Sequence, residues 1–237
     1  MEHNNDNITM NKAPIIQLKN ISKVFDSEEV ESHVLTGLDL SIHQGEYISI
    51  SGPSGSGKST LLSILGLLDT PTSGDYYIDG VKVDSLSMHD SAKVRNEKIG
   101  FIFQSFNLID ELSVLENVML PLKYNANWKD KNAIRTQAEE CLKKVGLEHR
   151  MNHKPNQLSG GQQQRVGIAR ALVGSPSVLL VDEPTGNLDS KSGDLVLDVL
   201  NQLHAEGATI CLVTHDPRYA DLAHIKYKLS DGILETA

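Results

Sequence analysis

The segment Gly52-Pro53-Ser54-Gly55-Ser56-Gly57-Lys58-Ser59 matches the pattern G-x-x-x-x-G-K-[ST] of a phosphate-binding loop. The residues before it, Tyr47 to Ser51, predict a short buried strand, and Thr60 to Leu68 predict a helix without charged residues. The loop would therefore lie at a helix N-terminus, where backbone N–H groups lack partners and the helix dipole is positive. This placement predicts a site for an anionic ligand such as the phosphates of a nucleotide.

The residue types in this loop suit phosphate chemistry. Its glycines let the backbone turn tightly and approach phosphate oxygens without a Cβ in the way. Lys58 reaches the β and γ phosphates as a point charge, and the Ser59 hydroxyl is a ligand for Mg²⁺. The alternative is a glycine-rich turn without a ligand, which the strand, the helix and the Lys-Ser pair together disfavour. The residues predicted to bind the nucleotide here are Gly52, Pro53, Ser54, Gly55, Ser56, Gly57, Lys58, Ser59 and Thr60.

The composition is that of a globular protein with one large domain, or a core with a subdomain. The chain has 237 residues, of which 39% are hydrophobic and 22% charged. A formal net charge of -9 argues against a nucleic-acid partner, which would require a basic face, but it does not exclude ATP. No apolar run reaches the roughly 18 residues that span a bilayer. Residues 1–12 are polar and unlike a secretory signal, so we expect a disordered tail and a cytoplasmic protein.

The two cysteines, Cys141 and Cys211, both lie in apolar patterns. A pair of cysteines in a chain of this length fits a reducing compartment. We therefore expect two buried free thiols rather than a disulfide.

The pattern of apolar residues predicts an α/β fold. The chain begins with strands at Ile15–Ile21, Val34–Ile42 and Tyr76–Ile78, which suggest an antiparallel layer over the core. Later strands alternate with helices, as in a doubly wound sheet; they are expected at Ile99–Gln104, Ser177–Val181 and Thr209–Thr214.

The region from Ser113 to roughly Gly174 is expected to be helical. Within it, one helix face is predicted to consist of Ile134, Ala138, Cys141, Leu142 and Val145, with a stop at Gly146. Asn127–Asn132, with the single tryptophan Trp128, is expected to be an exposed loop.

Two carboxylates, Asp182 and Glu183, follow the apolar run Val178–Val181. A carboxylate at the carboxyl end of a core strand lies at the edge of the sheet where ligands bind. Asp182 is then placed to hold Mg²⁺, and Glu183 to polarise a water for attack on a γ-phosphate. The alternative is a solvated strand end, which the presence of the phosphate loop disfavours.

Two further polar residues end predicted strands. His215 lies at the same edge of the sheet as Glu183, where it would contact the γ-phosphate, although a lone histidine at a strand end is more often structural. The Gln104 amide would reach Mg²⁺ or water, with an ordinary surface amide as the alternative.

A second glycine-rich turn, Leu158-Ser159-Gly160-Gly161-Gln162, precedes a predicted helix from Gln163 to Val173. Ser159 followed by two glycines is either a second anion site or a simple helix cap. A chain that binds one nucleotide rarely needs a second phosphate site of its own. The pattern therefore suggests a site shared between two copies.

Together these segments resemble the ATP-binding-cassette (ABC) ATPases, in order and across nearly the whole chain. The matching residues are Gly52–Ser59, Gln104, Leu158–Gln162, Val178–Glu183, Asn187-Leu188-Asp189 and His215. The resemblance implies a P-loop NTPase core of mostly parallel sheet with flanking helices and an antiparallel β layer. It also implies a single domain over residues 13–237, with a helical subdomain inserted at roughly residues 105–174, and hydrolysis of ATP with Mg²⁺.

The same resemblance implies a head-to-tail dimer that holds two ATP molecules. Each ATP would lie between the phosphate loop of one copy and Ser159, Gly160, Gly161 and Gln162 of the other. Asp189 would communicate across the dimer, and Phe25 would stack on adenine, with a core phenylalanine as the alternative for Phe25. Mg²⁺ would be held by Ser59, Gln104 and Asp182, and the catalytic residues would be Glu183, His215 and Gln104. Whether the two copies are identical or related subunits stays open.

Other segments resemble the LolD and MacB branch of this family: Leu67–Gly74, Phe101–Leu108, Leu115–Val118 and Pro184–Asp189. The branch implies a separate permease of the FtsX or MacB kind, which would attach the chain peripherally to the inner membrane. Its members extrude lipoproteins, peptides or antibiotics, and some, like FtsE, transmit force without transport. The apolar stretch from Phe103 to Leu122 forms either a groove for a permease helix or internal packing.

The rival classes fit the chain less well. ABC proteins of DNA repair insert a long coiled coil between the phosphate loop and the segment that corresponds to Leu158–Gln162, which we call the signature segment. In this chain, residues 60–158 show no sustained heptads. Those of translation carry two cassettes and basic surfaces. A regulator that binds nucleotide without turnover would not need Glu183 and His215.

Overall fold

The predicted strand before the phosphate loop is the centre of a six-stranded sheet in the computed structural model, which describes residues 13–27 and 30–237. This strand, β3 (Tyr47–Ser51), pairs in parallel with two strands from late in the chain, β8 (Ile210–Val213) and β9 (Ile225–Ser230). The sheet order is β10-β9-β3-β8-β7-β6, and only β10 runs antiparallel to its neighbour. The other strands are β6 (Ile99–Ile102), β7 (Val178–Asp182) and β10 (Ile233–Thr236).

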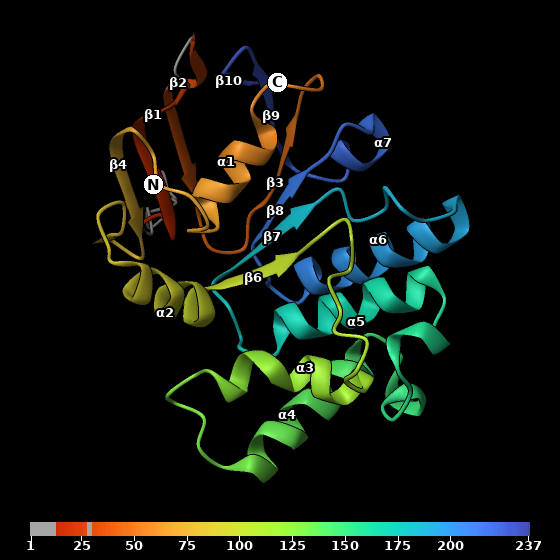
Figure 1. Cartoon of the computed structure of the whole chain (residues 1–237). Coiled ribbons are helices and arrows are strands. Elements are labelled where there is room, and N and C mark those ends of the chain that lie inside the picture. Colours follow the sequence, from red (N-terminus) through yellow and green to blue (C-terminus); the bar gives the residue numbers. More distant parts are fainter. Residues whose placement is uncertain (1–12, 28–29) are drawn as a thin grey trace, which may run out of the picture.

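A second sheet, entirely antiparallel, covers one side of the first, as Figure 1 shows. Helix α1 (Lys58–Leu65) lies between the two sheets, and the Thr36 N–H donates to the Gly232 carbonyl where they meet. The expected antiparallel layer is therefore confirmed. Its strands have the order β2-β1-β4-β5: β1 (Ile16–Ser27), β2 (Val30–Ile42), β4 (Ser73–Ile78) and β5 (Val81–Lys82).

The parallel strands are buried on both faces, as their continuous apolar runs predict. In β7, Val178 and Leu180 pack into the cluster that contains α1 and the antiparallel sheet, whereas Leu179 and Val181 pack into the cluster beneath the other helices. Both faces of the sheet therefore contribute to the core, and its polar strand ends are left for the site.

Most of the remaining helices cover the sheet face opposite α1 or extend beyond its edge, whereas α2 (Met88–Lys98) packs through Val94 into the cluster that contains α1 (Figure 1). Helix α4 buries the predicted face that includes Ile134, Ala138 and Cys141, and Gly146 follows its end with φ of 69°, a conformation that glycine adopts without strain. The helices are α2 (Met88–Lys98), α3 (Val114–Lys123), α4 (Lys131–Lys144), α5 (Gly160–Leu172), α6 (Ser190–Ala205) and α7 (Pro217–Ala220), with short 3₁₀ turns at Glu148–Arg150 and Pro155–Gln157.

Several expectations from the sequence need correction. Helix α1 begins at Lys58 rather than Thr60 and ends at Leu65 rather than Leu68, because Gly66 caps it and Leu67 takes a positive φ of 53°. Trp128 is not in a wholly exposed loop: its half-buried ring packs against the core, and α4 already begins at Lys131.

Other expectations are confirmed or fall outside the description. Cys141 and Cys211 are buried free thiols, as predicted. The disordered tail expected at residues 1–12 lies outside the described residues. Within residues 13–27 and 30–237, no helix combines the length and the apolar character needed to cross a membrane.

Candidate functional site

A cavity of about 880 Å³ opens at the carboxyl ends of the parallel strands. The phosphate loop forms its floor, and the segments that follow β7 and β8 form another side. The predicted residues that line it are Gly52, Pro53, Ser54, Gly55, Gly57, Lys58, Ser59, Thr60, Glu183 and His215. The structure thus brings most of the predicted site residues together in one place.

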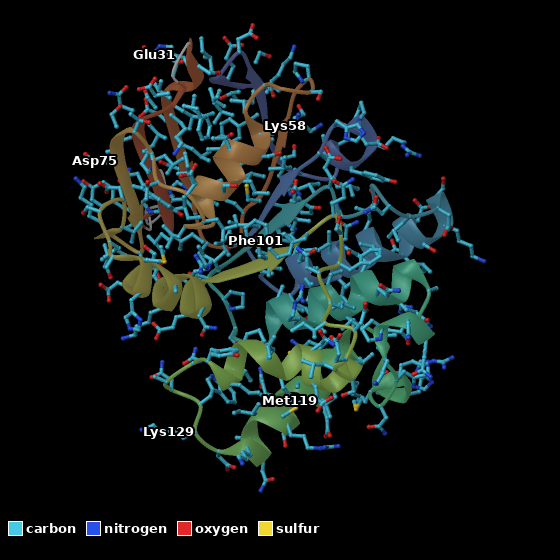
Figure 2. The ribbon with its side chains drawn as sticks, viewed as in Figure 1. Glu31, Lys58, Asp75, Phe101, Met119 and Lys129 are labelled. Atoms are coloured by element: carbon cyan, nitrogen blue, oxygen red, sulfur yellow. The ribbon has the colours of Figure 1, made fainter. Side chains whose placement is uncertain are left out.

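Lys58 is the first residue of α1, and only 9% of its surface is exposed. Its ammonium donates to the carbonyl oxygens of Gly52, at 2.9 Å, and Pro53, at 2.8 Å, so the side chain folds back over the loop. Figure 2 labels Lys58 beside α1. Gly57 precedes the helix with φ of 100°, which a residue with a Cβ adopts only under strain. Ser56 is the exception in this loop: it does not line the cavity, and its buried hydroxyl has no hydrogen-bond partner.

Glu183 and His215 meet across the ends of β7 and β8. The Glu183 Oε1 and His215 Nδ1 atoms lie 2.7 Å apart, with 19% of the Glu183 side chain and 67% of the His215 side chain exposed. The Glu183 backbone has φ of 40°, and its N–H donates to the Val213 carbonyl. A positive φ costs free energy in a non-glycine residue, and such residues cluster at active sites. The carboxylate is held in this strained turn beside the phosphate loop.

Asp182 is half-buried behind Glu183 and does not line the cavity. Burial raises the pKa of its carboxyl, the charge of Glu183 raises it further, and the Lys58 ammonium opposes both. Excess negative charge at this point favours a bound cation. No three His, Cys, Asp or Glu side chains among the described residues form a metal site by themselves. The predicted donors, the half-buried Asp182 carboxylate and the Ser59 hydroxyl, suit Mg²⁺, which takes few protein ligands and completes its shell with water and substrate phosphates.

Gln104 follows β6, and it also lies outside the phosphate cavity. Its side chain lies against Gly186, where a Cβ would come within 2.5 Å of the Gln104 Nε2 atom. The Asn187 amide donates to the Gln104 carbonyl oxygen at 3.1 Å. Gln104 is therefore joined to the segment that follows Glu183.

Ser159 caps α5 in a capping box with Gln162. The Ser159 hydroxyl accepts from the Gln162 N–H, and the Gln162 side chain accepts from the Ser159 N–H. A Cβ added to Gly161 would lie 3.0 Å from the Ser192 Cβ atom, so the signature segment packs tightly on the start of α6. Asp189 caps that helix by accepting from the Ser192 N–H, and hydrogen bonding to the Ser192 side chain, followed by that to its backbone, lowers the pKa of the Asp189 carboxyl. Ser159, Gly160, Gly161, Gln162 and Asp189 do not line the phosphate cavity of their own chain.

Phe25 is 46% exposed on β1 and does not line the phosphate cavity. The Lys23 ammonium lies 4.9 Å from the centre of its ring and donates to Asp69 at 2.7 Å. A half-exposed aromatic ring with a cation over it is available to stack on a base, and its exposure disfavours a purely structural role in the core.

Four residues that line the cavity were not predicted: Val34, Ser51, Pro217 and Lys228. Ser51 adjoins Gly52 and Pro217 lies two residues after His215, so proximity to the predicted site residues would have found them. Val34 and Lys228 come from strands that the fold brings alongside the loop, and no local sequence signal marks them.

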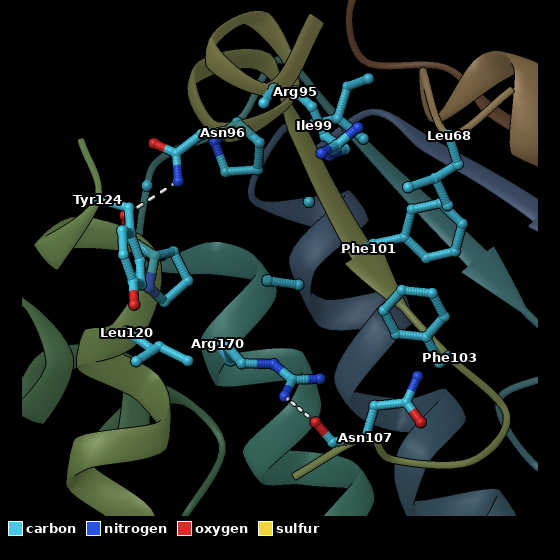
Figure 3. A pocket seen from close by; sticks show the side chains of 16 residues that line it. Leu68, Arg95, Asn96, Ile99, Phe101, Phe103, Asn107, Leu120, Tyr124 and Arg170 are labelled. Atoms are coloured by element: carbon cyan, nitrogen blue, oxygen red, sulfur yellow. Dashed lines mark hydrogen bonds between the residues drawn. The ribbon is translucent and has the colours of Figure 1, made fainter. Parts of the chain in front are cut away.

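A second cavity, of about 380 Å³, lies between α2, β6 and the end of α3 (Figure 3). Its lining includes Leu68, the stacked rings of Phe101 and Phe103, Leu120 and Tyr124. Leu68 is 51% exposed and Tyr124 is 80% exposed, so the cavity is an open apolar groove. Arg170 donates to the Asn107 carbonyl on another side of this groove.

The apolar stretch from Phe103 to Leu122 therefore divides between the two roles considered for it. Phe103 and Leu120 line the groove. The other apolar side chains here mostly serve internal packing, since Val114, Leu115, Val118 and Leu122 are buried in the core.

The comparisons with known proteins agree with this geometry. A family model described as ABC transporter matches residues 35–186. The ABC transporter ATP-binding protein YknY of Bacillus subtilis is 50% identical over 92% of this chain and 94% of its own length. A macrolide export ATP-binding/permease protein, MacB 1/2 of Paracoccus denitrificans, is 50% identical over 93% of this chain, which spans only 33% of that relative.

A solved structure shows the same fold. The dimeric post-hydrolysis state of the ATP-binding cassette MJ0796, bound to ADP and Pi, superimposes with a TM-score of 0.84 at 46% identity. The match covers 93% of this chain and 98% of that one, a protein from Methanocaldococcus jannaschii. The chain has the phosphate loop, the adjacent carboxylates of Asp182 and Glu183 and the signature segment, and it resembles these proteins in sequence and fold. It therefore belongs to the ABC transporter family.

Proposed function

We propose that this chain is the ATP-binding and ATP-hydrolysing subunit of an ABC transporter of the MacB and LolD type. The observation that carries the proposal is the meeting of Glu183 and His215, 2.7 Å apart, in the same cavity as Lys58 and the phosphate loop. One cavity thus contains the groups that bind phosphate and the groups that activate water. The MacB relative is named a macrolide export protein, and this name favours a transporter over a force-transmitting complex.

The chemistry is the hydrolysis of ATP to ADP and phosphate. Glu183 accepts a proton from a water molecule while the water oxygen bonds to the γ-phosphorus. The bond between that phosphorus and the oxygen that bridges to the β-phosphate breaks, and ADP leaves. His215 orients the Glu183 carboxylate through their hydrogen bond and contacts the γ-phosphate. Lys58 and the N–H groups of the loop hold the phosphates in place.

Mg²⁺ would be held by Ser59, Asp182 and Gln104, and Gln104 would contribute through a water. When bound, the ion would neutralise part of the negative charge of the triphosphate. Burial and, after it, the charge of Glu183 raise the pKa of the Asp182 carboxyl, and a bound cation would stabilise the carboxylate against both.

The working form is a head-to-tail dimer. Ser159 and Gly161 begin a helix whose first N–H groups suit an anion, yet they do not line their own chain's cavity. A second copy placed against the cavity would supply them to the γ-phosphate. ATP then favours the closed dimer, because those contacts exist only in that state, and hydrolysis removes them. Phe25 would hold the adenine at the other end of the nucleotide.

Mixing two defective variants tests this arrangement. Lys58→Ala impairs the loop but keeps the signature, and Ser159→Arg blocks the signature but keeps the loop. Each variant alone should be inactive, whereas an equal mixture should recover about a quarter of the wild-type ATPase rate, because half of its dimers have one intact shared site. Phosphate release measures the rate.

The matched control is Ser113→Arg, which removes the same kind of capping box from α3. It should leave the ATPase rate unchanged. If the mixture is as inactive as its components although both variants fold and dimerise, each copy uses its own signature, and the shared site is wrong.

The partner would be a transmembrane permease, which would attach the chain to the cytoplasmic face of the membrane. The MacB-type relatives are named as combined ATP-binding and permease proteins, and this chain corresponds to about a third of their length. The apolar groove lined by Phe103, Leu120 and Tyr124 is the surface we assign to that contact. An exposed apolar groove of this kind is typical of a surface that binds a helix.

Charges in the groove should weaken the membrane attachment. Leu68→Glu combined with Tyr124→Glu is expected to lower the membrane-bound fraction of the chain several-fold, because an apolar helix face would meet two carboxylates. Quantitative blotting of membrane and soluble fractions measures this. The control Val81→Glu changes a similarly exposed apolar residue outside the groove and should have no effect. Equal membrane binding by the groove variant and the wild type would exclude this surface.

A further inference from the structure

A second lysine, Lys228, lines the phosphate cavity together with Lys58. It lies on β9, whose backbone pairs in parallel with β3, and its Cα partner is Ser51, the residue immediately before the phosphate loop. The two strands also fit closely here, since a Cβ at Gly52 would collide with the Leu229 carbonyl oxygen. The position of Lys228 beside the loop is therefore fixed by the sheet.

The alternation of β9 shows on which side Lys228 lies. Tyr227 and Leu229 pack into the cluster that contains α1. Successive side chains of a strand point to opposite faces, so Lys228 lies on the other face, where α7 covers the sheet. His215 and Pro217 line the same cavity at that face. The ammonium of Lys228 is thus on the side of the cavity where we place the γ-phosphate.

The charges around the cavity leave Lys228 available for a ligand. Lys226, two residues earlier on the same face, is paired with Asp221 at 2.6 Å. No ion pair or side-chain hydrogen bond joins Lys228 to another side chain in the described part of the chain, and its side chain is exposed. Lys58 already donates to two carbonyl oxygens, and Asp182 and Glu183 add negative charge. A triphosphate brought into this cavity increases the need for a second cation.

We propose that Lys228 is a second phosphate-binding lysine, which contacts the terminal part of the nucleotide's phosphate chain from β9. The inference rests on the proposed function, because it assumes that ATP occupies this cavity. It assigns Lys228 to binding of the ligand and not to the chemical step.

Calorimetry with Lys228→Met tests this assignment, using the non-hydrolysable imido analogue of ATP, then ADP, then adenosine. The variant should bind the ATP analogue about 3- to 10-fold more weakly, the scale of a partly exposed charge-assisted hydrogen bond. The loss should be smaller for ADP and absent for adenosine. The matched control, Lys226→Met, removes a lysine from the same strand and face and should bind all three ligands like the wild type.

Salt and a conservative substitution provide a second measurement. Between low and high salt, the affinity of the wild type for the ATP analogue should fall more steeply than that of Lys228→Met, because screening weakens a contact that the variant lacks. Lys228→Arg keeps the charge and should retain most of the affinity.

The outcomes separate this inference from the proposed function. If the wild type binds no nucleotide, the proposed function itself fails. If the wild type binds the ATP analogue and Lys228→Met binds it equally well, only the role of Lys228 is overturned. An equal loss for the ATP analogue, ADP and adenosine would also overturn it, since such a loss reports a disturbed fold and not a lost phosphate contact.

Discussion

Replacement of Glu183 by glutamine is expected to lower the rate of ATP hydrolysis by about 100- to 10,000-fold, the usual contribution of a general base. The amide has nearly the shape of the carboxylate but cannot accept a proton from water. It can still hydrogen-bond to His215, 2.7 Å away, so the strained turn at Glu183 should be preserved. ATP should therefore bind to the variant and remain intact, so the closed dimer should accumulate.

Two measurements check this expectation together. Phosphate release gives the rate, and size-exclusion chromatography with light scattering, with and without ATP, gives the oligomeric state. The control Glu148→Gln alters an exposed carboxylate in the 3₁₀ turn Glu148–Arg150, which does not line the phosphate cavity, and should leave both measurements unchanged. A Glu183→Gln variant that hydrolyses ATP at the wild-type rate would refute the assignment of the base.

The variant Lys58→Ala should lose nucleotide affinity by about 100-fold or more. Charge-assisted hydrogen bonds contribute roughly 1.5–3 kcal/mol each, and Lys58 would make them to two phosphates. The side chain is 9% exposed and lies at the start of α1, whereas Lys228 reaches the cavity from β9 and would keep only its own contact with the phosphate chain. Calorimetric titration with ATP and ADP measures the loss.

A lost affinity must be separated from a lost fold, because Lys58 also bonds to the carbonyl oxygens of Gly52 and Pro53. Thermal unfolding monitored by circular dichroism provides this control. Lys58→Ala should still unfold cooperatively, at a temperature a few degrees lower. Undiminished binding of ATP by a folded Lys58→Ala variant would remove the phosphate-binding role of this lysine.

Where burial imposes a pattern, the sequence was sufficient to predict the fold. The continuous apolar runs of β3, β7 and β8 come from strands covered on both faces, and their predicted positions agree with the structure within one residue or so. Helix α2 was missed because no residue in it is buried, and without buried positions there is no apolar period to detect. Strand β9 was also missed, although Ile225, Tyr227 and Leu229 alternate with two lysines at the period of a strand.

The site was predictable to the extent that its parts are neighbours in the sequence. The phosphate loop and the pair Asp182 and Glu183 are local motifs, and the residue types within each already specify phosphate and cation chemistry. That Glu183 meets His215 depends on the pairing of β7 with β8, which places their carboxyl ends side by side. Val34 and Lys228 reach the cavity only through sheet contacts between distant segments, and no motif announces such contacts.

The position of β3 in its sheet bears on how the protein is made. Both of its neighbours, β8 and β9, come from residues 210–230, whereas the phosphate loop follows β3 directly at residue 52. During synthesis the ribosome releases the loop long before the strands that flank it, and domains generally fold as units. A nascent chain that carries the complete loop therefore lacks both flanking strands until residues 210–230 have been made. Termination before β9 should yield fragments without nucleotide affinity, so capture on immobilised ATP should select chains that extend through β9.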